Sequence, residues 1–132
     1  MIYLLDASAL IRYLTRSLSL SPLAKDVIDA PGAGNQLAIP TIALVEAWDM
    51  ARKQRRDFVP FSLTRDSIQS RNMIVENLTL AIVDRLPNEW GDSHDMIILA
   101  TALELQARYG EINVISSDRK MRFDQSLVPC LW

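Results

Sequence analysis

Four acidic residues, Asp6, Glu46, Asp95 and Asp118, stand where separate segments of the chain begin or end. Asp6 follows a short apolar run, and Asp118 follows a second apolar run after two serines. Glu46 lies about one turn into a segment whose apolar residues have helical spacing, and Asp95 lies in the first turn of another. Both share a helical stripe with apolar residues, so we expect their carboxylates to point away from bulk water. Four carboxylates from four elements are therefore expected to meet at one place.

Carboxylates gathered in this way repel one another and raise each other's pKa unless a cation neutralises them. Oxygen ligands without a cluster of His or Cys suit Mg²⁺ or Mn²⁺ rather than zinc. Such ions support hydrolysis of a phosphodiester bond, because they activate water near neutral pH and offset charge on the phosphate. The sequence thus predicts a metal-dependent phosphodiesterase, with Asp6, Glu46, Asp95 and Asp118 as catalytic and metal-binding residues.

Each acid also has a purely structural interpretation. Asp6 can form the turn that ends a strand, and Asp118 can cap the short segment that follows it. Asp92 and Asp95 have the spacing of a capping box, with Asp92 as the N-cap. Glu46 is harder to explain in this way, because an unpaired carboxylate on an apolar helix face is costly to bury. Taken alone, Asp92 is explained better as a cap than as part of the predicted site.

Two serines lie two residues from a predicted edge acid. The hydroxyls of Ser8 and Ser116 can orient a carboxylate or a water, or make local turn hydrogen bonds. His94 is the only histidine and Cys130 the only cysteine, and both are expected to be structural. The chain therefore offers no nucleophile–base pair that would compete with metal-assisted chemistry.

Charge limits how the chain can bind phosphate. With 14 Lys and Arg against 16 Asp and Glu, the net charge is −2, which excludes a strongly basic nucleic-acid coat. Phosphate affinity must then come from local positive charge. Arg119, Lys120 and Arg122 follow the last acid and are the candidates, whereas the basic residues at 52–56 suit the end of a helix. No aromatic stripe predicts a base-stacking platform, and Trp48 is expected in the core.

The elements that must position these residues alternate between short apolar runs and amphipathic segments. Strands are predicted at 2–5, 36–39, 72–75, 112–116 and 127–131, and helices at 7–16, 22–29, 42–55, 64–71, 79–86 and 93–108. The run Ile2–Leu5 lacks alternation, which is typical of a strand buried on both faces of a parallel sheet. An α/β fold with helices on both faces follows, and its ligands are expected at the carboxyl ends of the strands.

Length and composition agree with one globular domain. The chain has 132 residues, of which 49% are hydrophobic and 23% charged. A single cysteine cannot close an internal disulfide, so a reducing compartment is expected. The apolar start stops at Asp6, too early for a signal sequence or a transmembrane helix. We therefore expect a cytoplasmic domain with no membrane segment.

Other folds that place an Asp after the first strand fit less well. A haloacid-dehalogenase-type phosphatase needs a second Asp two residues further on, where this chain has Ser8. A response-regulator receiver needs an acidic pair before its phospho-acceptor and a Lys after a late strand. A dinucleotide-binding fold needs a glycine-rich first turn. None of these features is evident in the sequence.

Four segments resemble, in order and spacing, the four motifs of PIN-domain ribonucleases. They are 4–11 (LLDASALI), 40–46 (PTIALVE), 94–102 (HDMIILATA) and 115–119 (ISSDR). The total length is similar to that of the compact VapC-like toxins of bacterial and archaeal toxin–antitoxin pairs. The resemblance covers nearly the whole chain. It implies a single PIN domain over 1–132, with a Rossmann-like parallel sheet in the order 3-2-1-4-5.

The resemblance also implies endonucleolytic cleavage of RNA that depends on Mg²⁺ or Mn²⁺. It gives acid roles to the four acids and a hydroxyl role to Ser116, where the family often has Thr. Asp92 matches a position that some members fill with Asp. A cognate antitoxin protein and a homodimer are further implications. The chain departs from the family pattern at Met96 and over 57–91, a stretch expected to shape the choice of RNA.

Two other functions stay open at the level of sequence. One is a non-catalytic PIN-like module that binds RNA or a protein, and the other is a housekeeping PIN nuclease without an antitoxin. The presence of all four acids favours catalysis, because acids that repel one another are otherwise costly to keep together. An assay of metal-dependent cleavage separates the catalytic from the non-catalytic interpretation.

Overall fold

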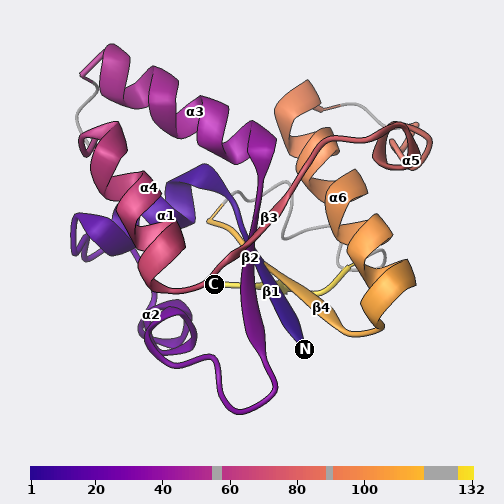
Figure 1. Cartoon of the computed structure of the whole chain (residues 1–132), viewed down its shortest axis with the longest axis horizontal. Helices are drawn as coiled ribbons and strands as arrows, with labels where there is room; N and C mark the ends of the chain where they lie inside the picture. Colours follow the sequence, from indigo (N-terminus) through magenta and orange to yellow (C-terminus); the bar gives the residue numbers. More distant parts are fainter. Residues whose placement is uncertain (55–57, 89–90, 118–127) are drawn as a thin grey trace.

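A parallel sheet of five strands lies at the centre of the computed structural model, which describes residues 1–54, 58–88, 91–117 and 128–132 (Figure 1). The strands are β1 (Ile2–Leu5), β2 (Gln36–Pro40), β3 (Ile74–Glu76), β4 (Ile112–Ile115) and β5 (Cys130–Leu131). Their order across the sheet is β3-β2-β1-β4-β5, and each neighbouring pair is parallel. The predicted α/β fold and strand order are both confirmed.

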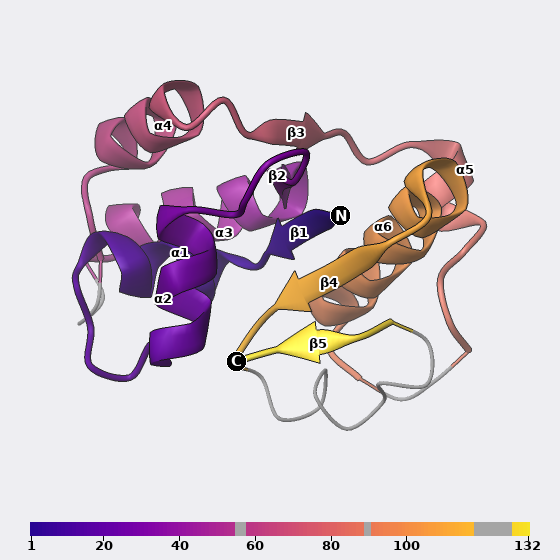
Figure 2. The ribbon, with the colours of Figure 1, turned by 90° about the horizontal axis from the view of Figure 1, so that it is seen from below.

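Six helices are found in the described residues. They are α1 (Ala7–Leu14), α2 (Pro22–Asp29), α3 (Thr41–Arg52), α4 (Phe61–Ser70), α5 (Leu80–Val83) and α6 (Ser93–Tyr109). Helices α1, α2 and α4 cover one face of the sheet, and α6, with α5 against it, covers the other (Figures 1 and 2). Each helix that follows a strand begins at the carboxyl edge of the sheet, the edge at which the acids were expected.

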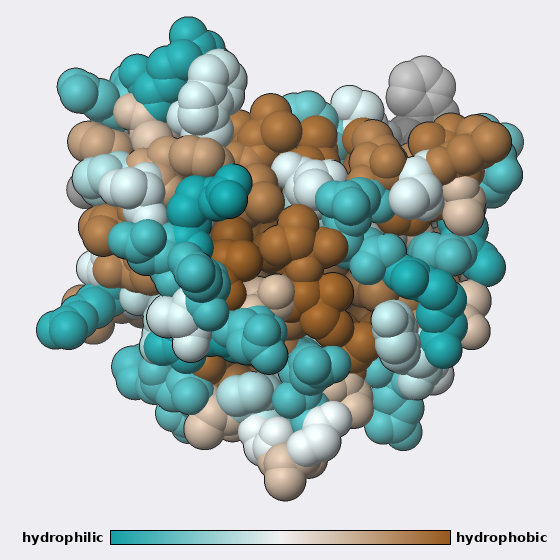
Figure 3. Space-filling model, viewed as in Figure 1, coloured by the Kyte–Doolittle hydropathy of each residue, from teal (hydrophilic) through white to brown (hydrophobic). Residues whose placement is uncertain are grey.

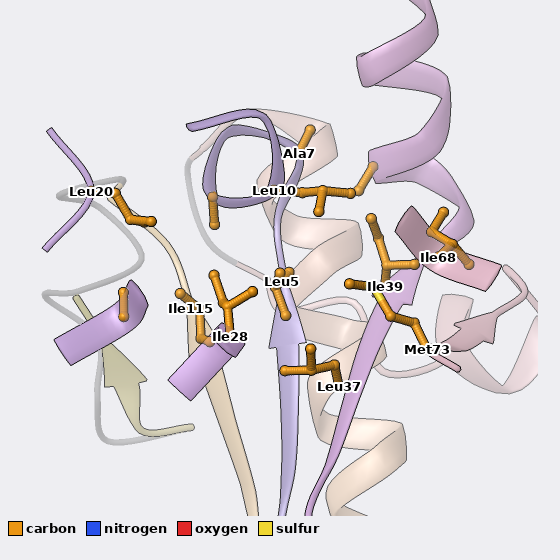
Figure 4. Close-up of a cluster of buried hydrophobic side chains, with 13 residues drawn as sticks. Leu5, Ala7, Leu10, Leu20, Ile28, Leu37, Ile39, Ile68, Met73 and Ile115 are labelled. Carbon is orange, nitrogen blue, oxygen red and sulfur yellow. The ribbon is translucent and has the colours of Figure 1, made fainter. Parts of the chain in front are cut away.

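Successive strand residues alternate between the two faces, which explains the continuous apolar runs. Leu5 and Ile115 belong to one buried cluster with α1, α2 and α4, here called the first cluster (Figure 4). Leu4 and Val114, one position earlier on each strand, pack instead with Ile98 and other residues of α6. Both strands are therefore held from two sides, which fixes the register of β1 and β4 and so the height of the residues that follow them.

Helix α3 extends beyond the carboxyl edge of the sheet (Figure 1). It packs against α1, α4 and α6. Its buried small residue Ala47 packs with Ile11 of α1 and Val59 before α4 in a separate small core. This core stabilises the part of α3 that overhangs the end of β1.

Element boundaries differ from the predictions in three informative places. Helix α4 begins at Phe61, three residues before the predicted start, because Pro60 occupies its N-cap position. Asn72, predicted to begin a strand, instead has a left-handed backbone with φ of 50° and closes α4. Strand β5 is limited to Cys130–Leu131 within its described part, since Pro129 has no N–H to donate.

The expectation that Trp48 lies in the core is wrong. The adjacent Ala47 takes the buried position on α3, and Trp48 is left 46% exposed. The guanidinium of Arg52 lies over its ring, 5.1 Å from the centroid. Arg52 and Lys53 are both paired with Asp49 at 2.7 and 2.8 Å, so one carboxylate offsets part of the positive charge at the end of α3.

Apolar side chains gather across the middle of the face seen in Figure 3, over the region where β3 forms the edge of the sheet. Val75 on this strand is 39% exposed. The strand is only three residues long, and its last residue, Glu76, is paired with Arg108 of α6. A short, charged edge strand resists pairing with another chain. In the part of the chain that the structure describes, no helix has the length and apolar character needed to cross a membrane.

Candidate active site

Asp6 is the best-defined acid at the carboxyl edge of the sheet. It follows β1 and is the N-cap of α1, where its Oδ1 accepts hydrogen bonds from the backbone N–H of Ala9 at 2.7 Å and the hydroxyl of Ser8 at 2.9 Å. Its Oδ2 accepts a hydrogen bond from the hydroxyl of Ser116, the residue after β4. Asp6 is 7% exposed, and these three donors fix the orientation of its carboxylate. The structural and functional interpretations of Asp6 are thus compatible, because a helix cap can also present a free oxygen lone pair.

Burial raises the pKa of Asp6 above 3.8, although the donors Ser116, Ala9 and Ser8 and the charge of Arg12 all lower it. Loss of water around the Asp6 carboxylate therefore outweighs three hydrogen bonds and the positive charge of Arg12. A carboxylate has about four lone-pair sites, and the three donors leave one of them, on Oδ2. A divalent cation at that oxygen would reverse the effect of burial on the pKa of Asp6.

Ser116 is held in place by the sheet itself. It is fully buried, and its backbone N–H donates to the carbonyl of Leu131 at 3.3 Å, which ties it to the end of β5. Ser8, in the first turn of α1, is only half-buried. The Asp6 carboxylate is therefore oriented from its own helix by Ser8 and from a neighbouring strand by Ser116.

Glu46 has a different environment from Asp6. It is half-buried on α3, and its Oε1 is buried without a hydrogen-bond partner among the described residues. Burial raises its pKa above 4.5, the positive charge of His94 lowers it, and the negative charges of Asp6 and Asp92 raise it. These interactions require Glu46 to lie close to both the start of α1 and the start of α6. The exposed Asp92 and His94 were not expected to face Glu46.

The start of α6 brings two further acids to this region. Asp92 is the N-cap, and its Oδ1 accepts a hydrogen bond from the backbone N–H of His94 at 2.8 Å, so its predicted capping role is confirmed. Asp95 lies in the first turn and is half-buried. It shares a helical stripe with Ile98 and Leu99, which are buried against the sheet. Asp95 therefore lies on the inward side of α6, at the end nearest Glu46.

The structure thus brings Asp6, Ser8, Ser116, Glu46 and Asp92 to one edge, with Asp95 one turn along α6. The other predicted site residues, Asp118, Arg119, Lys120 and Arg122, lie outside the described residues. The catalytic, metal-binding and phosphate-binding roles given to all of these residues remain predictions.

A divalent cation fits the chemistry of this edge. Among residues 1–54, 58–88, 91–117 and 128–132, no three His, Cys, Asp or Glu side chains lie close enough to hold a metal by themselves. Glu46 Oε1 has no hydrogen-bond partner among the described residues, and Asp6 Oδ2 keeps one lone pair beside the bond from Ser116, so both oxygens could bind a cation. Oxygen ligands with negative charge suit Mg²⁺ or Mn²⁺.

The sequence did not predict that Arg12 and Trp132 contact each other near this edge. The guanidinium of Arg12, on α1, lies 5.5 Å from the ring centroid of Trp132, the last residue of the chain. Their positions in the sequence, 12 and 132, give no local signal of contact. Only the parallel pairing of β5 with β4 brings them together.

Comparison with protein families gives one match. The model of the PIN domain matches residues 3–125, which is most of the chain. No curated protein matches the sequence. The matched range includes all four predicted acids.

Two solved structures share the fold over nearly their whole length. One contains VapBC2 from Rickettsia felis bound to a DNA fragment from their promoter, with a TM-score of 0.74, 14% identity, and coverage of 100% of this chain and 99% of the other. The second contains VapBC-1 from nontypeable Haemophilus influenzae, with a TM-score of 0.70, 16% identity, and coverage of 99% and 97%. At these identities the likeness extends to the fold and not to individual site residues.

Proposed function

This chain belongs to the PIN domain family, and from that premise we propose that it is a metal-dependent endoribonuclease that hydrolyses phosphodiester bonds in RNA. The observation on which this rests is the carboxylate of Asp6. It is buried and held by three donors, two from α1 and one from the residue after β4, and its negative charge acts on Glu46, whose Oε1 is buried without a partner among the described residues. A buried acid pair of this kind is costly unless a cation joins it.

In this proposal Asp6, Glu46, Asp95 and Asp118 hold Mg²⁺ or Mn²⁺. The ion, when bound, supplies activation of water and neutralises charge on the phosphate. Ser8, Ser116 and the backbone N–H of Ala9 occupy three lone-pair sites of the Asp6 carboxylate and leave one on Oδ2 that could bind the ion. Asp92 caps α6, which keeps the first turn that contains Asp95 in place.

The RNA contacts in this proposal come from cations close to the fourth acid. Arg119, Lys120 and Arg122 bind backbone phosphates, because a chain of net charge −2 needs local positive charge to hold RNA. The stretch 57–91, where the family resemblance is weakest, contributes to the choice of RNA. Unpaired loop bases are the expected target, since they can be reached by side chains.

The test is cleavage of a mixture of structured RNAs by the purified protein. We expect cleavage with Mg²⁺ or Mn²⁺, none in excess EDTA, and a loss of at least about a hundredfold for Asp6→Asn or Asp95→Asn. Circular dichroism spectra and melting curves establish that both variants are folded. Full activity in EDTA, or unchanged cleavage by both variants, would falsify the proposal.

We further propose that the protein is the toxin of a toxin–antitoxin pair, acting in the cytoplasm as a homodimer. The support is the fold shared with the VapBC structures. An antitoxin tail that inserts an Arg would suit this edge, because the planar guanidinium matches carboxylate oxygens and can exclude the metal.

Co-expression tests this partner. Growth arrest by the protein alone, relieved by the product of a neighbouring small open reading frame and absent with Asp6→Asn, is the expected result. Harmless expression together with metal-dependent RNA cleavage in vitro indicates a housekeeping nuclease instead. The molar mass in solution, from light scattering, tests the dimer separately.

A further inference from the structure

The C-terminal residue Trp132 forms a mixed aromatic and cationic surface with Arg12. The Arg12 guanidinium lies over the indole, 5.5 Å from its centroid, and both side chains are half-buried. Trp132 also packs against the first cluster, which fixes one side of the ring. In the described parts of the chain no salt bridge engages Arg12.

This pair lies next to Asp6 through a short series of contacts. The carbonyl of Leu131, the residue before Trp132, accepts a hydrogen bond from the backbone N–H of Ser116 at 3.3 Å. The hydroxyl of Ser116 in turn donates to Asp6. From the other side, the charge of Arg12 is close enough to Asp6 to lower the pKa of that carboxyl. Both members of the pair are thus anchored within a few residues of the proposed reaction centre.

We propose that Arg12 and Trp132 form a stacking platform for one unpaired base of the RNA substrate, beside the phosphate that is cleaved. The inference rests on the proposed function, because it assigns a base site to that same edge. Unpaired bases stack on aromatic rings and on guanidinium planes, and such stacking tolerates different sequences. Arg12 offers the base the plane that faces away from Trp132, and its charge also attracts the adjacent phosphate.

The chain contains a matched control in Trp48 and Arg52. Their separation is 5.1 Å, close to that of the proposed platform. Trp48 is two residues after Glu46 and so points about 200° around the helix from it, away from the acids. Arg52 is also paired with Asp49 at 2.7 Å. The same chemical pair is therefore present at a place where no substrate is expected.

Binding is measured in a protein that cannot cleave. Asp6→Asn removes cleavage, and Trp48→Phe with Trp90→Phe leaves Trp132 as the only tryptophan. The probes are short single-stranded oligoadenylate and oligouridylate. We expect oligoadenylate to change the fluorescence of Trp132 on binding and to bind more tightly than oligouridylate, because purines offer the larger stacking surface.

The remaining binding measurements use Asp6→Asn with Trp48 and Trp90 intact. Substitutions at the platform should weaken binding of oligoadenylate to this protein, followed by fluorescence anisotropy of the labelled RNA. Trp132→Leu and Arg12→Lys are each expected to weaken it about tenfold. Arg12→Lys keeps the charge beside Asp6 but lacks the plane, and Trp132→Phe keeps a ring and should restore most of the affinity. Trp48→Leu, the matched control, should leave it unchanged. In the cleaving protein, Trp132→Leu is expected to raise KM with little change in kcat.

The inference is overturned if the emission of Trp132 is unchanged at saturating RNA, or if Trp132→Leu and Arg12→Lys bind as tightly as the parent. It is also overturned if Trp132→Phe is as weak as Trp132→Leu, since the effect would then come from packing. A change in Trp132 fluorescence, together with no metal-dependent cleavage by the protein with Asp6 intact, supports the platform and contradicts the proposed nuclease function. Cleavage by Trp132→Leu with an unchanged KM supports the proposed nuclease function and contradicts the stacking platform.

Discussion

Asp6 and Glu46 are two acids at the same edge of the sheet, and they differ in burial and in hydrogen bonding. Asp6 is almost fully buried and accepts hydrogen bonds from three donors on two elements. Glu46 is half-buried on a helix that overhangs the sheet, and its Oε1 has no partner in the described residues. Burial raises the pKa of both carboxyls.

The difference indicates that the two carboxylates would take part in binding one cation in different ways. The orientation of Asp6 is determined before anything binds, because its donors belong to the backbone and to residues packed around β1 and β4. Glu46 has no hydrogen bond to Oε1 among the described residues, so this oxygen is not held in one orientation by a donor. A rigid acid and an adjustable acid together can hold a cation without a complete cage in the metal-free protein.

The largest effect that separates the two acids should be on metal rescue of activity. In Asp6→Asn the amide oxygen stays at the Oδ1 position, because the Ala9 N–H requires an acceptor there. The amide nitrogen then occupies the Oδ2 position and has no lone pair for a metal. In Glu46→Gln, by contrast, the amide oxygen can rotate to face the ion. We expect raised Mn²⁺ to restore about a tenth or more of the activity of Glu46→Gln and none of Asp6→Asn.

Cleavage rates over a titration of Mn²⁺ test this difference. Glu46→Asp is the control, because it keeps the charge and shortens the side chain by one methylene. Equal rescue of Asp6→Asn and Glu46→Gln would mean that the hydrogen bonds of Asp6 do not determine which of its atoms faces the ion.

Ser116→Ala should make Asp6 behave more like Glu46. The substitution removes the donor to Oδ2 and leaves a buried carboxylate with two hydrogen bonds. A hydrogen bond to a charged group contributes about 1.5–3 kcal/mol, so the melting temperature should fall by roughly 5 to 10 °C. The neighbouring Ser117→Ala is the control and should change it by about 1 °C or less. A fall of equal size in both variants would show a general effect of this segment.

Glu46→Gln should stabilise the metal-free protein at neutral pH, in contrast to Ser116→Ala. It removes the charge of the Glu46 carboxyl, whose pKa is raised by burial and by the negative charges of Asp6 and Asp92. We expect the melting temperature without metal to rise by about 2 °C, and the further rise caused by saturating Mn²⁺ to shrink. Melting curves in EDTA and in Mn²⁺ measure both effects. A lower melting temperature in EDTA would mean that Glu46 is stabilised by contacts in the metal-free protein.

The sequence predicts the place of an acid well when the interactions that position it are between residues close together in the sequence. The placement of Asp6 after a buried strand and of Asp95 in the first turn of a helix depends on periodicities of a few residues. The strand order came from the family resemblance, since short apolar runs do not specify which strands are neighbours. The hydroxyl of Ser116 reaches Asp6 across 110 positions of the sequence, so the pairing of these two residues was visible only in the folded chain.

The aromatic residues show the limit of periodicity most clearly. On α3, Ala47 and Trp48 differ by one position, which is about 100° around the helix and enough to exchange a buried site for an exposed one. A helical pattern with small residues on its buried side does not show where a large ring belongs. Trp132 has no pattern around it, and only the pairing of β5 with β4 brings it to Arg12.

The smallest expected effect is the response of stability to pH in the metal-free protein. Asp6 and Glu46 have pKa values raised from 3.8 and 4.5 in the folded state, so folding takes up protons above these ordinary values. Their stabilising contribution is complete below the ordinary values and is lost as the pH rises through the raised ones. The melting temperature should therefore increase by about 1 °C as the pH falls from about 7 to about 5. Asp49 has a lowered pKa, because Lys53 and Arg52 hydrogen-bond to it, and it stays ionised throughout this window. The double variant Asp6→Asn, Glu46→Gln should lose the increase and Asp49→Asn should keep it, whereas an equal increase in all three proteins would assign the pH response to groups away from the acid edge.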